Sequence, residues 1–219
     1  MSSPRRVGRP RAVARDRTGL TPREEVLAAA AELFTEQGYA ATTTRAVAER
    51  AGIRQASIYH YFKGKEEIFA TLLESTVHPS LETARALMDA SAPAEARLWA
   101  LASRDVRLLC SGPHNLGVLY LLPEAERFAR FQELRDALKN AYARLLSDMA
   151  VAATLTEAER GMRARLVFSL VESVILIRKD APGLLVESMA EAAADAALRV
   201  SGVPDGELPG MRALGRELI

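Results

Sequence analysis

Hydrogen-bonding side chains crowd one short stretch of the sequence, which reads SIYHYFKGK over residues 57–65. The side chains in it with strong N–H or O–H donors and long reach are Tyr59, His60, Tyr61 and Lys65. Only Ile58 and Phe62 are obvious core residues, so the donors are left to point outward. The chemistry open to such a set is hydrogen bonding to a partner rich in oxygen acceptors.

The segment before this stretch predicts a supporting helix with well-marked ends. Thr21-Pro22-Arg23-Glu24 has the pattern of a capping box, in which the threonine hydroxyl accepts from the Glu24 amide and the Glu24 carboxylate accepts from the Thr21 amide. Apolar residues follow at helical spacing, namely Val26, Leu27, Ala30, Leu33 and Phe34. Gly38 is expected to end the helix, since glycine adopts the left-handed backbone conformation readily.

Two short helices are predicted next. Threonines at 42–44 offer caps for the first, Arg45 to Ala51, which ends at Gly52. The second runs from Gln55 to Tyr61, and Lys63-Gly64-Lys65 separates it from a fourth helix that starts at Lys65. A supporting helix followed by two short helices around a glycine turn is the outline of a helix-turn-helix, placed here at about 44–63.

In a helix-turn-helix the second helix lies in the major groove of DNA, and the chain around it contacts phosphates. Gln55 is a candidate for bidentate hydrogen bonding to adenine, Ser57 can serve either base, and the Ala56 methyl can touch a thymine methyl. The candidates for phosphate contact are Tyr59, His60, Tyr61 and Lys65. Lys65 would act together with the free amides at the start of the fourth helix.

About a dozen positions between residues 25 and 69 form a pattern at fixed spacing. They are AAAELF in the first helix, Gly38-Tyr39, the threonines before the second helix, Val47-Ala48, Ala51-Gly52-Ile53, and Tyr59 with Phe62 and Lys65. This stretch, about a fifth of the chain, resembles the DNA-binding domain of TetR-family transcriptional regulators. The resemblance implies that Thr44 and Arg45 approach the DNA backbone or a base. Where the family usually has a small capping residue this chain has Arg54, which is assigned instead to phosphate or guanine.

Basic residues are concentrated at the beginning of the chain. Residues 1–65 contain 12 of the 29 Lys and Arg residues but only 6 of the 28 Asp and Glu residues. The remainder of the chain therefore has 17 basic and 22 acidic residues. The asymmetry suggests that the first part meets a polyanion, although a solvated basic tail explains the charge equally well. Residues 1–20 are predicted to be a disordered basic arm. Its arginines either follow a narrow minor groove or add only non-specific affinity, and those assigned to DNA are Arg5, Arg6, Arg9 and Arg11.

The rest of the chain is predicted to be helical, because alanine and leucine recur at helical spacing without a strand pattern. Helices are expected near 80–90, 94–110, 115–121, 124–150, 156–179 and 183–201, with a break at Pro79. The fold class is therefore all-α. A three-helix helix-turn-helix domain at 21–67 precedes a larger helical domain at 68–202, and a loosely held C-terminal tail occupies 203–219.

The resemblance implies that this larger domain binds a ligand and dimerises. The last two helices carry apolar stripes that would pair with a second copy, and the alternative is a core within one chain. The residues assigned to the dimer interface are Leu166, Leu170, Val174, Ile177, Leu185, Met189 and Ala193. The residues available to a pocket for a small, mainly apolar effector are Trp99, Arg107, Leu109, His114, Tyr120, Phe128 and Phe131. Each of these residues, taken alone, is more typical of core or surface than of a ligand contact.

Other classes of protein find little support in the sequence. Cys110 is the only cysteine, so neither an intrachain disulfide nor a cysteine cluster for zinc can form. The three histidines lack metal-ligand spacing, and neither a phosphate-binding glycine loop nor a nucleophile elbow is present. No catalysis, cofactor or metal is expected. The longest apolar run, Leu166 to Ile177, is shorter than the ~20 residues of a membrane helix, so no membrane span and a cytoplasmic location are expected.

The sequence thus predicts a sequence-specific DNA-binding transcriptional regulator. The expected partners are an inverted-repeat operator in double-stranded DNA, a second copy of the chain and an unidentified effector, in the manner of a ligand-responsive repressor. Two alternatives stay open. One is an enzyme whose site is assembled only by the fold, and the other is a helix-turn-helix regulator whose second domain binds a protein or only dimerises.

Overall fold

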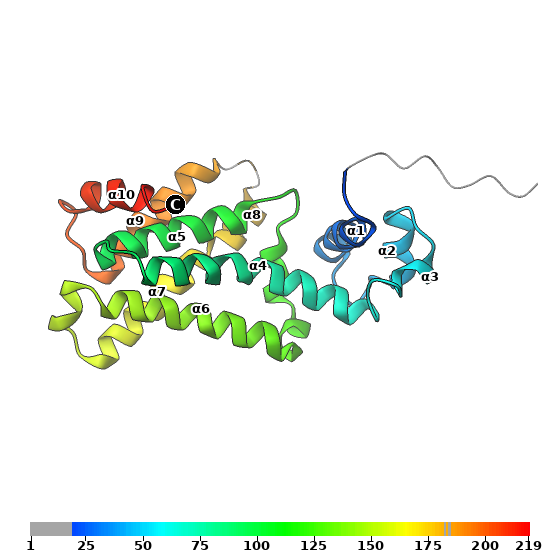
Figure 1. Cartoon of the computed structure of the whole chain (residues 1–219), viewed down its shortest axis with the longest axis horizontal. Helices are drawn as coiled ribbons and strands as arrows, with labels where there is room; N and C mark the ends of the chain where they lie inside the picture. Colours follow the sequence, from blue (N-terminus) through cyan, green and yellow to red (C-terminus); the bar gives the residue numbers. More distant parts are fainter. Residues whose placement is uncertain (1–18, 182, 184) are drawn as a thin grey trace, which may run out of the picture.

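The computed structural model describes residues 19–181, 183 and 185–219, and all regular elements among them are helical. The N-terminal helices are α1 (Pro22–Gln37), α2 (Thr44–Arg50), α3 (Gln55–Ile58) and α4 (Lys65–Met88). The remainder comprises α5 (Ala94–Cys110), η1 (Leu116–Leu121), η2 (Pro123–Arg127), α6 (Ala129–Ser147), η3 (Ala150–Thr154), α7 (Glu157–Glu172), α8 (Val174–Asp180), α9 (Val186–Ser201) and α10 (Leu208–Arg216). Figure 1 shows α1–α3 as a small unit at one end of an elongated molecule, with α4 running from it into the larger bundle. The all-α prediction is confirmed.

The first helix begins and ends where the sequence predicts. The Thr21 amide donates to Glu24 Oε2 at 2.7 Å, and the Glu24 amide donates to Thr21 Oγ1 at 3.3 Å, which completes the capping box. The Thr21 hydroxyl also donates to Glu24 Oε2 at 2.7 Å, and this hydrogen bond lowers the pKa of the Glu24 carboxyl most, followed by the one from the Thr21 amide. At the other end Gly38 has φ of 82°, a value that favours glycine.

A compact core holds the three N-terminal helices against the start of α4. Its fully buried members include Val26, Phe34, Val47, Ile58, Phe62, Ile68 and Phe69. Ile58 and Phe62 come from α3 and the turn after it, as the sequence predicted for the two core residues of that stretch. These two side chains fix the rotation of α3 about its own axis, so the polar residues between them face outward.

The predicted break at Pro79 is wrong, because α4 continues through this residue to Met88. A proline inside a helix removes one backbone hydrogen bond and crowds the carbonyl four residues earlier. Here the cost is offset by burial on both sides, since Val77 and Leu81 are almost completely removed from solvent. The predicted boundaries of the later helices differ in smaller ways. The helix expected at 124–150 divides into η2 and α6, and the one at 156–179 divides at Ser173.

The loosely held tail predicted at 203–219 is also wrong, because α10 packs on α5. Gly215 lies so close to Trp99 that an added Cβ would come within 2.5 Å of the indole ring. Arg212 pairs with Asp195 of α9, and Asp195 also accepts from the Trp99 indole at 2.9 Å. The sequence pattern alone does not reveal this contact, because it joins residues distant in the chain.

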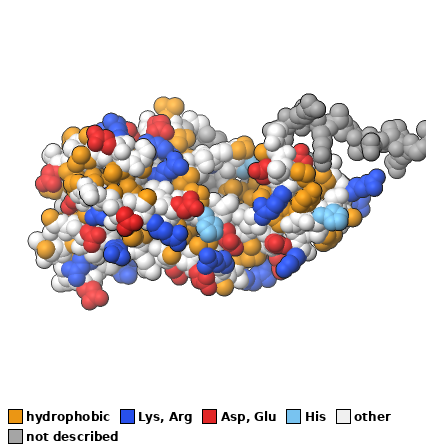
Figure 2. Space-filling model, in the orientation of Figure 1, with side chains coloured by type: hydrophobic (Ala, Val, Ile, Leu, Met, Phe, Trp, Pro, Cys, Tyr) orange, Lys and Arg blue, Asp and Glu red, His pale blue; other side chains and the backbone are white. Residues whose placement is uncertain are grey.

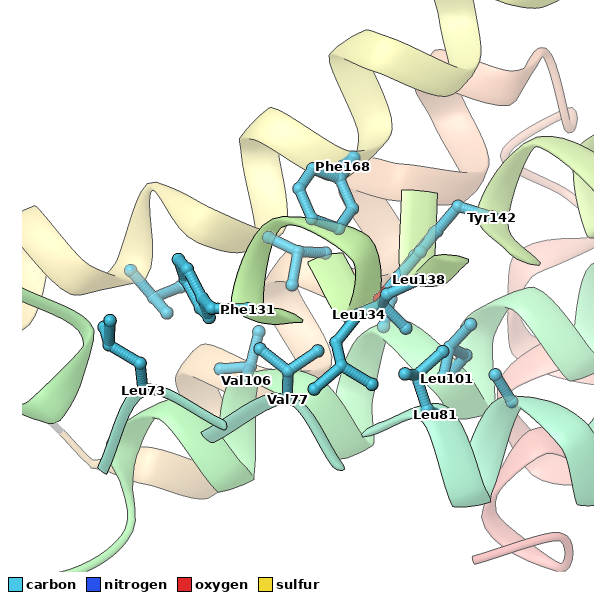
Figure 3. Packing of buried hydrophobic residues seen from close by; sticks show 14 of the residues in the cluster. Leu73, Val77, Leu81, Leu101, Val106, Phe131, Leu134, Leu138, Tyr142 and Phe168 are labelled. Carbon is cyan, nitrogen blue, oxygen red and sulfur yellow. The ribbon is translucent and has the colours of Figure 1, made fainter. Parts of the chain in front are cut away.

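The large domain has a continuous hydrophobic core in which α5 packs chiefly on α9 and α4 chiefly on α6. Figure 3 shows labelled side chains of α4, α5 and α6 converging beneath Phe168 of α7. None of the helices among the described residues is long and apolar enough to cross a membrane.

One carboxyl group is buried in this core. Asp105 of α5 is 3% exposed, and its Oδ2 accepts a hydrogen bond of 2.7 Å from the Tyr142 hydroxyl of α6. Its Oδ1 has no hydrogen-bond partner among the described residues. Burial raises the pKa of Asp105 to about 7, an effect that the neighbouring Tyr142 and Ser80 hydroxyls only partly oppose.

We therefore expect the protein to become less stable between pH 5 and pH 7. Folded Asp105 keeps its proton up to a pKa of about 7, whereas in the unfolded chain the pKa is about 3.9. The unfolded state binds fewer protons in this range, so the free energy of unfolding falls as the pH rises, by roughly 2 to 3 kcal/mol over two pH units. Urea unfolding at several pH values measures this change.

The Asp105→Asn variant should lose this pH dependence, because its amide does not titrate. Asp136→Asn is the matched control, since Asp136 is exposed and pairs with Lys139 at 2.8 Å, which lowers its pKa. The control should follow the wild-type curve above pH 5. Parallel curves for wild type and Asp105→Asn would contradict the expectation.

Candidate nucleic-acid interface

The turn between α2 and α3 is held by local backbone contacts. Gly52 has φ of 67°, and the Ile53 amide donates to the Ala48 carbonyl at 3.0 Å across the turn. At the start of α2, the Thr43 hydroxyl accepts from the Ala46 amide at 3.1 Å, so Thr43 is the N-cap. These local contacts therefore help to set the orientation of α2 relative to α3.

The outward face of this unit carries the side chains that the sequence assigned to base reading. Gln55 and Ala56 are exposed and Ser57 is half-buried, while Ile58 beside them is completely buried. Gln55 Nε2 lies 3.4 Å from Thr44 Oγ1, a long hydrogen bond that links α3 to α2. Both ends of the Gln55 amide can therefore be redirected to a base edge at little cost.

Donor side chains flank this face. Tyr59 is 56% exposed and Tyr61 39% exposed, both large fractions for tyrosine, and His60 between them is also exposed. They lie in the turn after α3, which is shorter than the predicted helix Gln55 to Tyr61. Figure 2 shows a histidine and a few basic side chains on the visible face at this end of the molecule. Exposed O–H and N–H donors beside a helix that is predicted to contact bases are well placed to donate hydrogen bonds to phosphate oxygens.

The two arginines assigned to this face have different surroundings. Arg45 Nε donates to Glu49 Oε1 at 2.9 Å on the exposed side of α2, so DNA contact by Arg45 requires exchange of that partner. Arg54 is exposed at the N-cap position of α3 and makes no capping hydrogen bond with its side chain. That observation agrees with the prediction that Arg54 does not cap. The arm residues Arg5, Arg6, Arg9 and Arg11 lie outside the described residues.

Lys65 has a positioning role that the sequence did not reveal. Its ammonium donates to the carbonyls of Tyr39 at 2.8 Å and Thr42 at 2.9 Å and lies 4.1 Å from the centre of the Tyr39 ring. Thr42 is buried and its hydroxyl donates back to the Gly38 carbonyl at 2.9 Å. Lys65 thus ties the start of α4 to the loop that precedes α2. Because an ammonium has three donors, one remains for a phosphate.

The candidate pocket residues are not brought together in one place. Leu109 and Tyr120 line a small chamber between α4 and α6, and His114 lines a depression next to it. Trp99 and Phe131 are core residues, Phe128 packs on Phe69, and Arg107 pairs with Glu187. The chamber also contains Asp105, Arg135 and Glu172, none of which the sequence predicted as pocket residues. Asp105 gives no periodic signal because it is a single polar residue within an apolar stripe.

The candidate dimer residues fall into two groups. Leu166, Ile177 and Leu185 are exposed, and Leu185 reaches 75%. Leu170 and Met189 are half-buried, whereas Val174 and Ala193 belong to the core of the chain. Exposed leucine and isoleucine side chains on α7, α8 and the approach to α9 are typical of a surface that is covered by a partner.

Comparison with known proteins gives consistent results. Residues 26–72 match the family model described as bacterial regulatory proteins, tetR family. The chain is 34% identical over 120 residues to the HTH-type transcriptional repressor KstR2 of Mycobacterium tuberculosis, an alignment that covers 53% of this chain and 59% of that protein. It is 24% identical over 152 residues to the fatty acid metabolism regulator protein of Bacillus subtilis, covering 69% and 78%. The chain therefore spans little more than half the length of the KstR2 repressor.

The crystal structure of Mycobacterium smegmatis AmtR is similar over a longer range. The chain is 41% identical to it, with a TM-score of 0.83, and the alignment covers 92% of this chain and 96% of that one. A Thermus thermophilus regulator, PfmR, shares the fold at 23% identity and a TM-score of 0.69. With a helix-turn-helix at residues 44–63, a matched family model over it and this similarity along nearly the whole chain, the protein belongs to the TetR family of bacterial regulatory proteins, which are DNA-binding regulators and not enzymes.

Proposed function

We propose that this protein is a transcriptional repressor that binds an inverted-repeat operator as a homodimer and leaves it when the large domain binds an effector. The observation that carries the proposal is the outward face of α3, where Gln55 and Ala56 stand exposed above the fully buried Ile58. Regulators of this family bind DNA operators and typically form homodimers. The proposal includes a cytoplasmic location, because the chromosome of a bacterium lies in the cytoplasm.

In this proposal α3 enters the major groove and the residues around it hold the backbone. Gln55, Ala56 and Ser57 face the bases, and the phosphate contacts come from Tyr59, His60 and Tyr61, with Thr44, Arg45 and Arg54 at the edges of the groove. The two α3 helices of a dimer would occupy successive major grooves, with half-sites about 34 to 36 Å apart or a multiple of that spacing. Occlusion of a promoter would then account for repression.

Selection of DNA from a random pool by the purified protein tests the proposal. The expected product is a palindrome, because twofold symmetry in the protein imposes it on the site. Gln55→Ala should relax the preference at one base position in each half-site and cost roughly 1 to 3 kcal/mol on the preferred site alone. Tyr61→Phe is the matched control, which should weaken binding to all sequences alike. Equal losses on every sequence for both variants would remove α3 from the reading role.

Lys65 is expected to have a double effect because it both ties the loop before α2 and offers a donor to phosphate. Lys65→Met keeps the apolar stem but removes two charge-assisted hydrogen bonds to the Tyr39 and Thr42 carbonyls. The free energy of unfolding should fall by roughly 2 kcal/mol, and affinity for all DNA sequences should fall with a shallower salt dependence. Chemical denaturation and titrations at several salt concentrations measure the two effects.

Lys63→Met provides the control for stability, since Lys63 is exposed and its side chain makes no hydrogen bond with another described residue. Its free energy of unfolding should stay within about 0.5 kcal/mol of the wild type. If Lys65→Met were as stable as Lys63→Met, the Lys65 ammonium would not position the loop.

The homodimer is proposed to form through α7, α8 and the approach to α9. Leu166 is 52% exposed on α7, so a Leu166→Glu variant should fold normally while placing two like charges in the interface. Sedimentation should then show a monomer, and operator affinity should fall because each half-site must be bound separately. Leu121→Glu is the control, because Leu121 is similarly exposed but lies on η1. A dimer in both variants would place the interface elsewhere.

A further inference from the structure

A chamber of about 20 Å³ lies in the core of the large domain, among α4, α5, α6 and α7. Its apolar walls are Val77, Leu109, Leu138, Phe168 and Val171, and its polar side chains are Thr76, Ser80, Asp105, Tyr120, Arg135 and Glu172. A space of this size holds one small group, about as large as a water molecule. The number of polar side chains around so small a space is unusual for a hydrophobic core.

Most of these polar groups satisfy one another. The Tyr120 hydroxyl donates to Thr76 Oγ1, and the Arg135 guanidinium pairs with Glu172, with Nε 2.8 Å from Oε1. Tyr142 donates to Asp105 Oδ2. By hydrogen-bond geometry, Asp105 Oδ1 alone among the chamber's carboxylate oxygens is buried without a donor in the described part of the chain, although the nearby Ser80 hydroxyl helps to lower the pKa of this carboxyl. The chamber therefore offers one strong, unused acceptor.

The charges around the chamber favour a cation. Asp105 and Glu172 carry two negative charges when ionised, and Arg135 supplies one positive charge. Tyr120 and Tyr142 stay neutral, since burial raises the pKa of each far above neutrality. Arg104, on the exposed side of α5, is the remaining cation close enough to lower the pKa of Asp105, and its effect is the smallest. One positive charge placed at Asp105 Oδ1 would balance the site.

Two surface depressions adjoin the chamber, and only one suits a cation. The depression of about 460 Å³ between α6 and α7 is lined by Arg135, Lys139, Arg165 and Glu172, so the charged side chains of its wall are positive on balance and disfavour a cation. The other, of about 200 Å³ between α4, α5 and η1, is lined mainly by apolar and small residues, and its wall contains His114 but no lysine or arginine. It shares Thr76 and Leu109 with the chamber, so the hydrogen bond from Tyr120 to Thr76 stands at the junction.

We propose that the chamber binds the ammonium group of a small primary amine whose apolar body lies in the depression between α4, α5 and η1. The ammonium donates a hydrogen bond to Asp105 Oδ1. As the ammonium enters the chamber from the depression, Thr76 Oγ1 gives up its hydrogen bond from Tyr120 and accepts one from the ligand. This inference rests on the proposed function and deepens it, because it names the chemical class of the effector and the residue that recognises it.

Thermal unfolding of the full chain at pH 8 with n-hexylamine, 1-hexanol and hexanoate tests the inference. Hexylamine should raise Tm in a saturable manner, whereas hexanol and hexanoate at equal concentration should raise it little. Asp105→Asn should weaken hexylamine binding by about 30-fold or more, because the amide lacks the charge and presents a donor to the chamber. Asp136→Asn, a surface change on the neighbouring helix, should bind hexylamine as the wild type does.

Affinity for hexylamine should also depend on pH. Asp105 must be ionised to bind the ammonium, and burial raises its pKa to about 7. Binding at pH 5.5 should be weaker than at pH 8.5 by roughly 30-fold in the wild type. In Asp105→Asn this dependence should disappear.

Stronger stabilisation by hexanol or hexanoate than by hexylamine would overturn the inference, and that comparison needs no variant. Unchanged hexylamine affinity in Asp105→Asn would overturn it as well. Selection of DNA with the same preparation separates this result from the proposed function. A palindrome without amine binding removes the inference alone, whereas the absence of any selected DNA removes the proposed function.

Discussion

The continuity of α4 is the constraint on which the rest of the molecule depends. Ile68 and Phe69, at the start of this helix, are buried in the core of the helix-turn-helix unit, and Leu81 and Leu87, near its end, are buried in the core of the large domain. Figure 1 shows the helix bridging the two parts. α4 continues through Pro79 as one helix from the small core into the large one, so its direction within the large domain fixes where α3 lies.

Lys65 extends this constraint to the loop before α2. Its two hydrogen bonds to the Tyr39 and Thr42 carbonyls connect the first residue of α4 to the loop between α1 and α2. α3 is attached to the same body through the buried Ile58 and Phe62. A tilt of α4 would therefore move the small domain as a unit. In the proposed dimer, such a tilt would change the separation of the two α3 helices without rearranging either small domain.

The features that the sequence predicts correctly are local ones. The capping box at Thr21, the glycine end at Gly38 and the outward face between Ile58 and Phe62 each depend on residues a few positions apart. The uninterrupted path of α4 through Pro79 and the packing of α10 against Trp99 depend on residues far away in the chain, so sequence spacing did not reveal them. The hydrogen bonds of Lys65 were not predicted for the same reason, since its carbonyl partners lie more than twenty residues earlier.

Asp105 destabilises its own surroundings, and it lies where several helices of the large domain meet. A buried carboxylate oxygen without a donor destabilises the folded state, and an apolar side chain of similar volume would avoid that cost. The Asp105 carboxyl lies where α4, α5 and α6 meet, because Ser80 and Thr76 of α4 and Tyr142 of α6 surround it. A ligand that supplied this donor would stabilise the contacts among α4, α5 and α6. Through α4, its binding energy would act on the position of the two α3 helices in the proposed dimer.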